Sequence, residues 1–164
     1  MKKALHIIAV ACAAAFMAVL ASAQIPAPGD LRKNILATAQ SLIGIQYVPG
    51  GSTEAGFDCS GYVKFVYEKN GIVLPRTAPA QYAKGVKIPL EKARPADLVF
   101  FDVYKTGISH VGIYMGEKKF IHAPSPGGRV HIAVIDQYYW QDKLVGAAAF
   151  IDDNTPAPKD QKKP

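Results

Sequence analysis

The apolar positions of residues 59–71 repeat with the spacing of a helix. Every third or fourth position is apolar, which defines one stripe along the helix: Cys59, Tyr62, Val63, Val66 and Tyr67. Asp58 is a favourable N-cap, and Gly71 is a favourable residue just beyond the helix end. The pattern therefore predicts a helix with a cysteine in its first turn, its sulfur on the packed side.

The rest of the first half is helical, and the second half is extended. We expect a helix from Asp30, as its N-cap, to about Leu42, and a short helix from Thr77 to about Ala83. Segment 84–95 is predicted to be a loop. Segments rich in Val, Ile, Phe and Tyr then predict five strands, at 98–104, 109–115, 119–122, 129–134 and 145–151, with a helical turn at 135–141. Helices followed by antiparallel strands indicate an α+β domain.

The N-terminus has the composition of an export signal. A positive start at Lys2 and Lys3 is followed by an apolar run over residues 4–20 and by the small-residue site 21–23. We predict a signal peptide over 1–23, a linker over 24–29, the domain over 30–151 and a disordered tail over 152–164. The location would be periplasmic or secreted, with no stable membrane insertion after cleavage. A retained anchor and a lipoprotein site at Cys12 are the alternatives.

Charge and cysteine content narrow the function. The formal net charge is +6, but the basic residues are scattered, which argues against nucleic acid and suits an anionic polymer such as a cell wall. Beyond the signal peptide, only Cys59 remains, so an internal disulfide is excluded. Cys59 is then a reactive thiol, one half of an intermolecular bridge, or an inert buried residue.

Two histidines complete a candidate catalytic set. A helix N-terminus favours the thiolate form of Cys59. Strand alternation over 109–115 places His110 on the face opposite the expected core. His122 would share that face as a diagonal neighbour if the intervening turn has three residues or if a strand carries a bulge. Cys59 would then attack a carbonyl, His110 would act as base and acid, and His122 would orient His110. His131 has no supporting pattern, and we interpret it as structural.

Three ordered segments resemble the signatures of the NlpC-type cell-wall cysteine peptidases. They are Gly-Phe-Asp-Cys-Ser-Gly at 56–61, Ser-His-Val-Gly-Ile-Tyr at 109–114 and Phe-Ile-His-Ala at 120–123. Further similarity is found at 47–51, at 74–77 with Gln81, and at 94–101, where Ala96 replaces the family's usual glycine. The resemblance covers about residues 30–151, nearly the whole predicted domain.

The resemblance implies a papain-like fold, in which N-terminal helices pack against a five- to six-stranded antiparallel sheet. It implies an exported cysteine endopeptidase that hydrolyses peptide bonds in peptidoglycan stem peptides or cross-links. Tyr47 would donate to the oxyanion together with the Cys59 backbone N–H. Asp58 and Ser60 would recognise a substrate amino group, and Arg76 would line the groove. We expect no metal or cofactor, and a monomer.

Three alternative functions are compatible with the same residues. A papain-like thiol amidase or acyltransferase on a non-wall substrate would need the same site. Cys59, His110 and His122 are also ligand types for zinc, although no short paired-ligand spacing is present. A catalytically inactive wall-binding domain is the third alternative.

Overall fold

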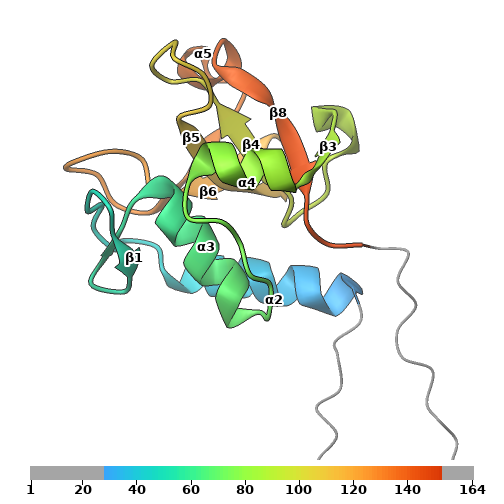
Figure 1. The fold of residues 1–164 in the computed structure, drawn as a ribbon, viewed down its shortest axis with the longest axis horizontal. Helices are drawn as coiled ribbons and strands as arrows, with labels where there is room; N and C mark the ends of the chain where they lie inside the picture. Colours follow the sequence, from blue (N-terminus) through green and yellow to red (C-terminus); the bar gives the residue numbers. More distant parts are fainter. Residues whose placement is uncertain (1–27, 153–164) are drawn as a thin grey trace, which may run out of the picture. The chain divides into compact units, whose positions relative to one another are not determined.

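A computed structural model describes residues 28–152 of the chain (Figure 1). The predicted signal peptide and the predicted tail beyond Asp152 lie outside the described residues. The helices are α2 (Pro28–Ser41), α3 (Cys59–Lys69), α4 (Ala78–Lys84), α5 (Tyr138–Gln141) and the 3₁₀ turn η1 (Leu90–Lys92). The strands are β1 (Ser52–Thr53), β2 (Gly56–Phe57), β3 (Val86–Ile88), β4 (Leu98–Phe101), β5 (His110–Gly116), β6 (Lys119–His122), β7 (His131–Val134) and β8 (Leu144–Ala149).

Helix α3 begins and ends where its sequence predicts. Asp58 is the N-cap, and its carboxylate accepts a hydrogen bond from the Gly61 N–H at 2.7 Å. Gly71 follows the C-cap with a φ of +82°, a conformation that glycine adopts without strain. Cys59 therefore occupies the first position of the helix, where the backbone N–H groups have no acceptor within the helix.

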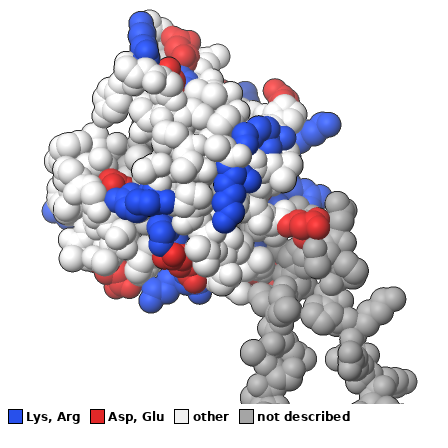
Figure 2. Space-filling model, in the orientation of Figure 1, with Lys and Arg blue, Asp and Glu red and all other residues white. Residues whose placement is uncertain are grey.

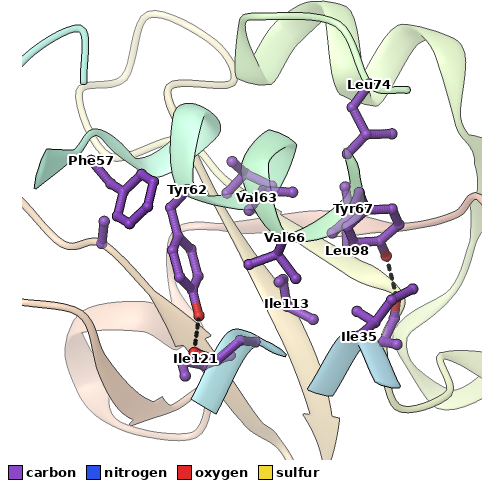
Figure 3. Packing of buried hydrophobic residues seen from close by; sticks show 14 of the residues in the cluster. Ile35, Phe57, Tyr62, Val63, Val66, Tyr67, Leu74, Leu98, Ile113 and Ile121 are labelled. Carbon is purple, nitrogen blue, oxygen red and sulfur yellow. Dashed lines mark hydrogen bonds between the residues drawn. The ribbon is translucent and has the colours of Figure 1, made fainter. Parts of the chain in front are cut away.

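The inward stripe of α3 forms the centre of the main core. Tyr62, Val63, Val66 and Tyr67 are fully buried against α2 and one face of the large sheet (Figure 3). The two tyrosine hydroxyls do not remain unpaired, because Tyr62 donates to the Ala39 carbonyl at 2.9 Å and Tyr67 donates to the Ala96 carbonyl. A buried ion pair between Arg32 and Asp97 fastens α2 to the start of β4. These contacts fix α3, and with it Cys59, relative to the sheet.

The large sheet has six antiparallel strands in the order β3-β8-β4-β5-β6-β7, within the predicted range of five to six. The prediction of a loop over 84–95 was wrong, because that segment contains β3 and η1. Strand β3 has only three residues and is defined by pairing with Ala147–Ala149 of β8. Such a short strand has too little local pattern to be predicted, since long-range pairing creates it.

Helix α2 also departs from prediction at its start. It begins at Pro28, so Asp30 lies in the first turn and is not the N-cap. An acidic residue in the first turn still interacts favourably with the helix dipole. Within residues 28–152, no helix combines the length and the apolar character needed to cross a bilayer.

A bulge in β5 decides which side chains share a face. The turn to β6 consists of Glu117 and Lys118, both with positive φ, and a two-residue turn alone would put His110 and His122 on opposite faces. The pairing of β5 with β6 shifts register between Tyr114 and Gly116. This one-residue shift brings both histidines to one face. Of the two predicted alternatives, a three-residue turn or a bulge, the structure has the bulge.

The histidine face of the sheet has its own apolar cluster. Phe101, Phe120 and Ala133 are buried there, and Trp140 from α5 packs over them. Val111 and Ile113, which alternate with His110 along β5, belong to the main core on the helix side. The sheet therefore separates an apolar layer under α2 and α3 from a second layer that holds the two imidazoles.

Candidate active site

Cys59 faces the strand that carries His110. Its Sγ lies 4.0 Å from the backbone oxygen of Ser109, the residue directly before His110. Cys59 is half-buried, and it is the free cysteine among the residues that the structure describes. Cys59 and His110 line the same cavity, whose volume is about 480 Å³. The structure thus brings the predicted nucleophile and the predicted base to one surface depression.

The two predicted histidines are hydrogen-bonded to each other. Nε2 of His110 lies 2.7 Å from Nδ1 of His122, and both rings are buried. If the His110 Nε2–H donates to His122, the His110 Nδ1 is left as an acceptor for the thiol proton. His122 lies behind His110 and does not line the cavity. Of the two imidazoles, His110 is therefore the one that borders the cavity.

Burial favours the neutral forms of the thiol and both imidazoles. It raises the pKa of the Cys59 thiol, the Asp58 carboxylate raises it further, and the backbone N–H groups of Val111 and Ser60 lower it only in part. Burial lowers the pKa of His110 to about 4, and burial with the neighbouring imidazoles lowers the pKa of His122 well below its ordinary value. The prediction of a resting thiolate at the helix N-terminus is thus not supported, since burial and the Asp58 carboxylate together raise the pKa of the thiol.

Tyr47 stands at the cavity wall, as predicted for a residue that meets the substrate. It lines the cavity together with Cys59, and its own backbone N–H donates to the Gly128 carbonyl at 2.8 Å. Partial burial raises the pKa of the Tyr47 hydroxyl, and the nearby Cys59 and Asp58 raise it further. The hydroxyl is therefore protonated at neutral pH and is able to donate a hydrogen bond.

Asp58, Ser60 and Arg76 form a group beside the cavity but are not among its lining residues. Arg76 binds the Asp58 carboxylate through both terminal nitrogens, at 3.0 and 2.6 Å, and also donates to the Ser60 hydroxyl at 3.1 Å. Burial alone would raise the pKa of Asp58, but the hydrogen bonds from Arg76 and from the Gly61 N–H hold it below its ordinary value. A substrate amino group would have to share Asp58 with Arg76.

Trp140 contacts both histidines and the cavity, although the sequence pattern predicts only a helical turn for the segment that contains it. Its ring stacks on His110, with centroids 5.3 Å apart at 28°, and stands edge-to-face against His122 at 5.0 Å. It also lines the cavity with Tyr104 and Tyr139. The aromatic run at 138–140 was the available signal, but nothing in the sequence connects α5 to the ends of β5 and β6.

Most of the face that Figure 2 shows is uncharged, with Lys and Arg at several separate places and a few of them near one another on the right-hand side. This agrees with the scattered basic residues of the sequence. Within residues 28–152, no three His, Cys, Asp or Glu side chains are grouped so that they could hold a metal ion. The nitrogens of His110 and His122 that face each other are engaged in their mutual hydrogen bond.

A cysteine at the start of a packed helix and a histidine pair on the adjoining antiparallel sheet define the class of papain-like thiol hydrolases. Residues 44–149 match the NlpC/P60 family, and the chain belongs to that family. The family resemblance seen in the sequence is thereby confirmed, as is the α+β fold.

Individual proteins with similar sequences or structures support the family assignment. A gamma-DL-glutamyl hydrolase of Bacillus subtilis (strain 168) is 44% identical over 82% of this chain and 32% of its own length. A probable endopeptidase p60 of Listeria monocytogenes serovar 1/2a is 53% identical over 68% of this chain and 22% of its own length. A solved NLP/P60 family structure from Staphylococcus aureus subsp. aureus Mu50 has a TM-score of 0.69 and 38% identity, covering 75% of this chain and 42% of that one. The chain thus spans about a third or less of these two curated relatives.

Proposed function

We propose that this chain is an exported cysteine endopeptidase that hydrolyses peptide bonds in peptidoglycan stem peptides or cross-links. The observation that carries the proposal is the His110–His122 hydrogen bond behind a cavity that Cys59 and His110 line together. The substrate class is supported by relatives with the names probable endopeptidase p60 and probable peptidoglycan endopeptidase LytE. Export rests on the signal-peptide pattern of residues 1–23.

The proposed reaction starts from a neutral thiol and a neutral imidazole. Nδ1 of His110 takes the proton of Cys59 while the sulfur attacks the peptide carbonyl, because burial disfavours a standing ion pair before substrate is bound. The new charge on His110 is stabilised by its hydrogen bond to His122. His110 then returns the proton to the leaving amine, and water hydrolyses the acyl-enzyme by the same groups.

The oxyanion that forms on the carbonyl needs donors at the cavity wall. The Cys59 backbone N–H is one, since the first residue of a helix has no helical acceptor for it. The Tyr47 hydroxyl, protonated and adjacent to Cys59, is the second donor that we propose. Asp58 and Ser60 are proposed to bind the substrate's amino group at the edge of the cavity, where Arg76 orders the Asp58 carboxylate.

Digestion of purified peptidoglycan tests this function. Wild-type protein should release muropeptide fragments whose masses, measured by mass spectrometry, identify the broken bond, while Cys59→Ala and His110→Ala should release none above background. Lys87→Ala is a suitable control, because Lys87 lies on β3, does not line the cavity, and interacts with nearby backbone carbonyls and the Tyr82 ring. Turnover retained by a clean Cys59→Ala preparation would overturn the mechanism. Absence of turnover by the wild type, combined with Cys59-dependent cleavage of other amides, would support a thiol amidase instead.

A further inference from the structure

Three imidazoles lie in a row across three neighbouring strands. His110 is on β5, His122 is on β6, and His131 is on β7, directly opposite His122 in the β6–β7 register. Side chains directly opposite each other in an antiparallel pair share a face. His131 therefore stands beside the two imidazoles of the proposed site, on the side away from Cys59, although no sequence motif links it to them.

The ring of His131 is held against His122. The two ring centroids are 4.7 Å apart, at an interplanar angle of 61°. Nδ1 of His131 lies 2.8 Å from the backbone oxygen of Arg129, so this nitrogen carries a proton that it donates to the carbonyl. That hydrogen bond orients the His131 ring while leaving the residue exposed to solvent. The solvent-exposed ring of His131 thus touches the fully buried imidazole of His122.

His122 must hold its protons in one way for the proposed chemistry. That chemistry requires His122 to accept from His110 at Nδ1, and the neutral form of His122 then carries its proton on Nε2. That Nε2 is buried and has no hydrogen-bond partner among the described residues. No acceptor therefore selects this tautomer, and the rings of His131 and Trp140, which stand at steep angles to His122, are its close neighbours.

We propose that His131 is a positioning residue for the histidine pair: it covers His122 from the next strand and, when charged, keeps His122 neutral with Nδ1 free to accept from His110. If His122 were also protonated, its Nδ1 would carry a proton and would donate to Nε2 of His110. The proton of His110 would then be on Nδ1, which could no longer accept the proton of Cys59. A charged His131 opposes that protonation because like charges repel at this short distance.

Few charged or titratable groups lie close to His122. Those that bear on the protonation of His122 are His110 from β5 and His131 from β7, while the neighbouring α5 contributes the uncharged ring of Trp140. The Arg129 side chain, which is close in sequence to His131, instead donates to the Gly44 carbonyl. The expected effect of His131 on the histidine pair is therefore a direct electrostatic one.

Histidine NMR tests the proposal without relying on catalysis, which matters because the inference rests on the proposed function. Ring-nitrogen spectra of the wild type and of His131→Gln would be followed from pH 8 to pH 4, with signals assigned by His110 and His122 variants. We expect neutral His122 to carry its proton on Nε2, and the protonation step of the pair to occur at higher pH in His131→Gln. A step that stays in place, or a proton on Nδ1 of His122, would overturn the proposal.

Kinetics provide the second measurement. In His131→Gln the acid limb of kcat/KM should move to higher pH, with little change in the rate at pH 7.5. His131→Arg carries a permanent charge about two strand spacings from His110, which should slow turnover at pH 7.5 roughly two- to fourfold. Ile132→Gln, on the same strand but the opposite face, is the matched control and should leave the profile unchanged. Loss of stability without movement of the acid limb would show that His131 is only structural.

These outcomes are separable from failure of the proposed function. If the protein does not cleave peptidoglycan, the NMR titration still reports whether His131 sets the protonation of His122. If it does cleave but the titration of the pair is indifferent to residue 131, the function stands and this inference falls.

Discussion

Nε2 of His110 and Nδ1 of His122 face each other at 2.7 Å, and both side chains are buried. Because both imidazoles are buried, the pKa of each is lowered, that of His110 to about 4. The unfolded chain binds protons on these residues at pH values where the folded chain does not. The free energy of unfolding is therefore highest above about pH 6.5, where both histidines are neutral in either state, and it decreases as the pH falls toward 4.

We accordingly predict a steep acid dependence of folding. His110 alone should lower the free energy of unfolding by roughly 3 kcal/mol between pH 6.5 and pH 4, and His122 acts in the same direction. Urea unfolding of wild type and His110→Asn across this range measures the difference, which isolates the histidine from the carboxylates. Between pH 7 and 8 the two curves should run parallel. If His110→Asn showed an equally steep acid dependence, buried His110 would not be its cause.

The Asp58 carboxylate is predicted to restrain the reactivity of Cys59. Asp58→Asn keeps an N-cap of similar quality but removes the negative charge that raises the pKa of the thiol. Alkylation of Cys59 by iodoacetamide should then reach half its maximal rate at lower pH than in the wild type. The lost pairing with Arg76, whose side chain is 39% exposed, should reduce stability by only about 1 kcal/mol.

Glu68→Gln is the control for this experiment. Glu68 lies on the same helix, far from its N-terminus, and its carboxylate pairs with Lys64. The alkylation profile of this variant should match that of the wild type. A profile for Asp58→Asn that also matches, or that moves to higher pH, would show that the carboxylate does not act on the thiol.

Gly112 is predicted to be required for the approach of β6 to β5. A Cβ at this position would lie 2.6 Å from Cδ2 of Phe120 and 3.2 Å from Cβ of His122. The space beside His110 is thus occupied by side chains of the next strand. Gly112→Ala should cost about 1–3 kcal/mol through overpacking and should displace His122 from His110, so that kcat falls as well.

Thermal unfolding and peptidoglycan turnover would be measured together for this variant. Gly29→Ala serves as the comparison, since a Cβ on Gly29 meets nothing within 4 Å and the residue lies in α2. It should leave turnover unchanged and should not destabilise the protein. Full activity and stability in Gly112→Ala would contradict the close packing that we describe.

Ala96 is predicted to be under backbone strain. It has a φ of +72°, and its backbone groups are fixed by hydrogen bonds to Tyr114 and from Tyr67. The left-handed conformation costs a non-glycine residue about 1–2 kcal/mol, so relief of strain in Ala96→Gly should offset the lost methyl burial. Ala93→Gly, at an ordinary φ of −66°, should instead lose about 1 kcal/mol. If Ala96→Gly and Ala93→Gly lost the same free energy of unfolding in denaturant, Ala96 would not be strained.

The sequence alone determined the elements whose signals are local. The Asp58 cap, the apolar stripe from Tyr62 to Tyr67 and Gly71 are contiguous, and they define α3 and the place of Cys59 on it. Alternation along β5 likewise assigned His110 and Val111 to opposite faces, because side-chain direction in a strand follows from its period of two. Similarity of ordered motifs supplied the family and the α+β fold.

Only the tertiary structure decided how separate segments meet. The bulge between Tyr114 and Gly116, the pairing that creates β3, and the placement of Trp140 and His131 against the histidine pair depend on contacts between distant residues. Desolvation is also a tertiary property: burial raises the pKa of the Cys59 thiol, which opposes the thiolate that a helix N-terminus favours.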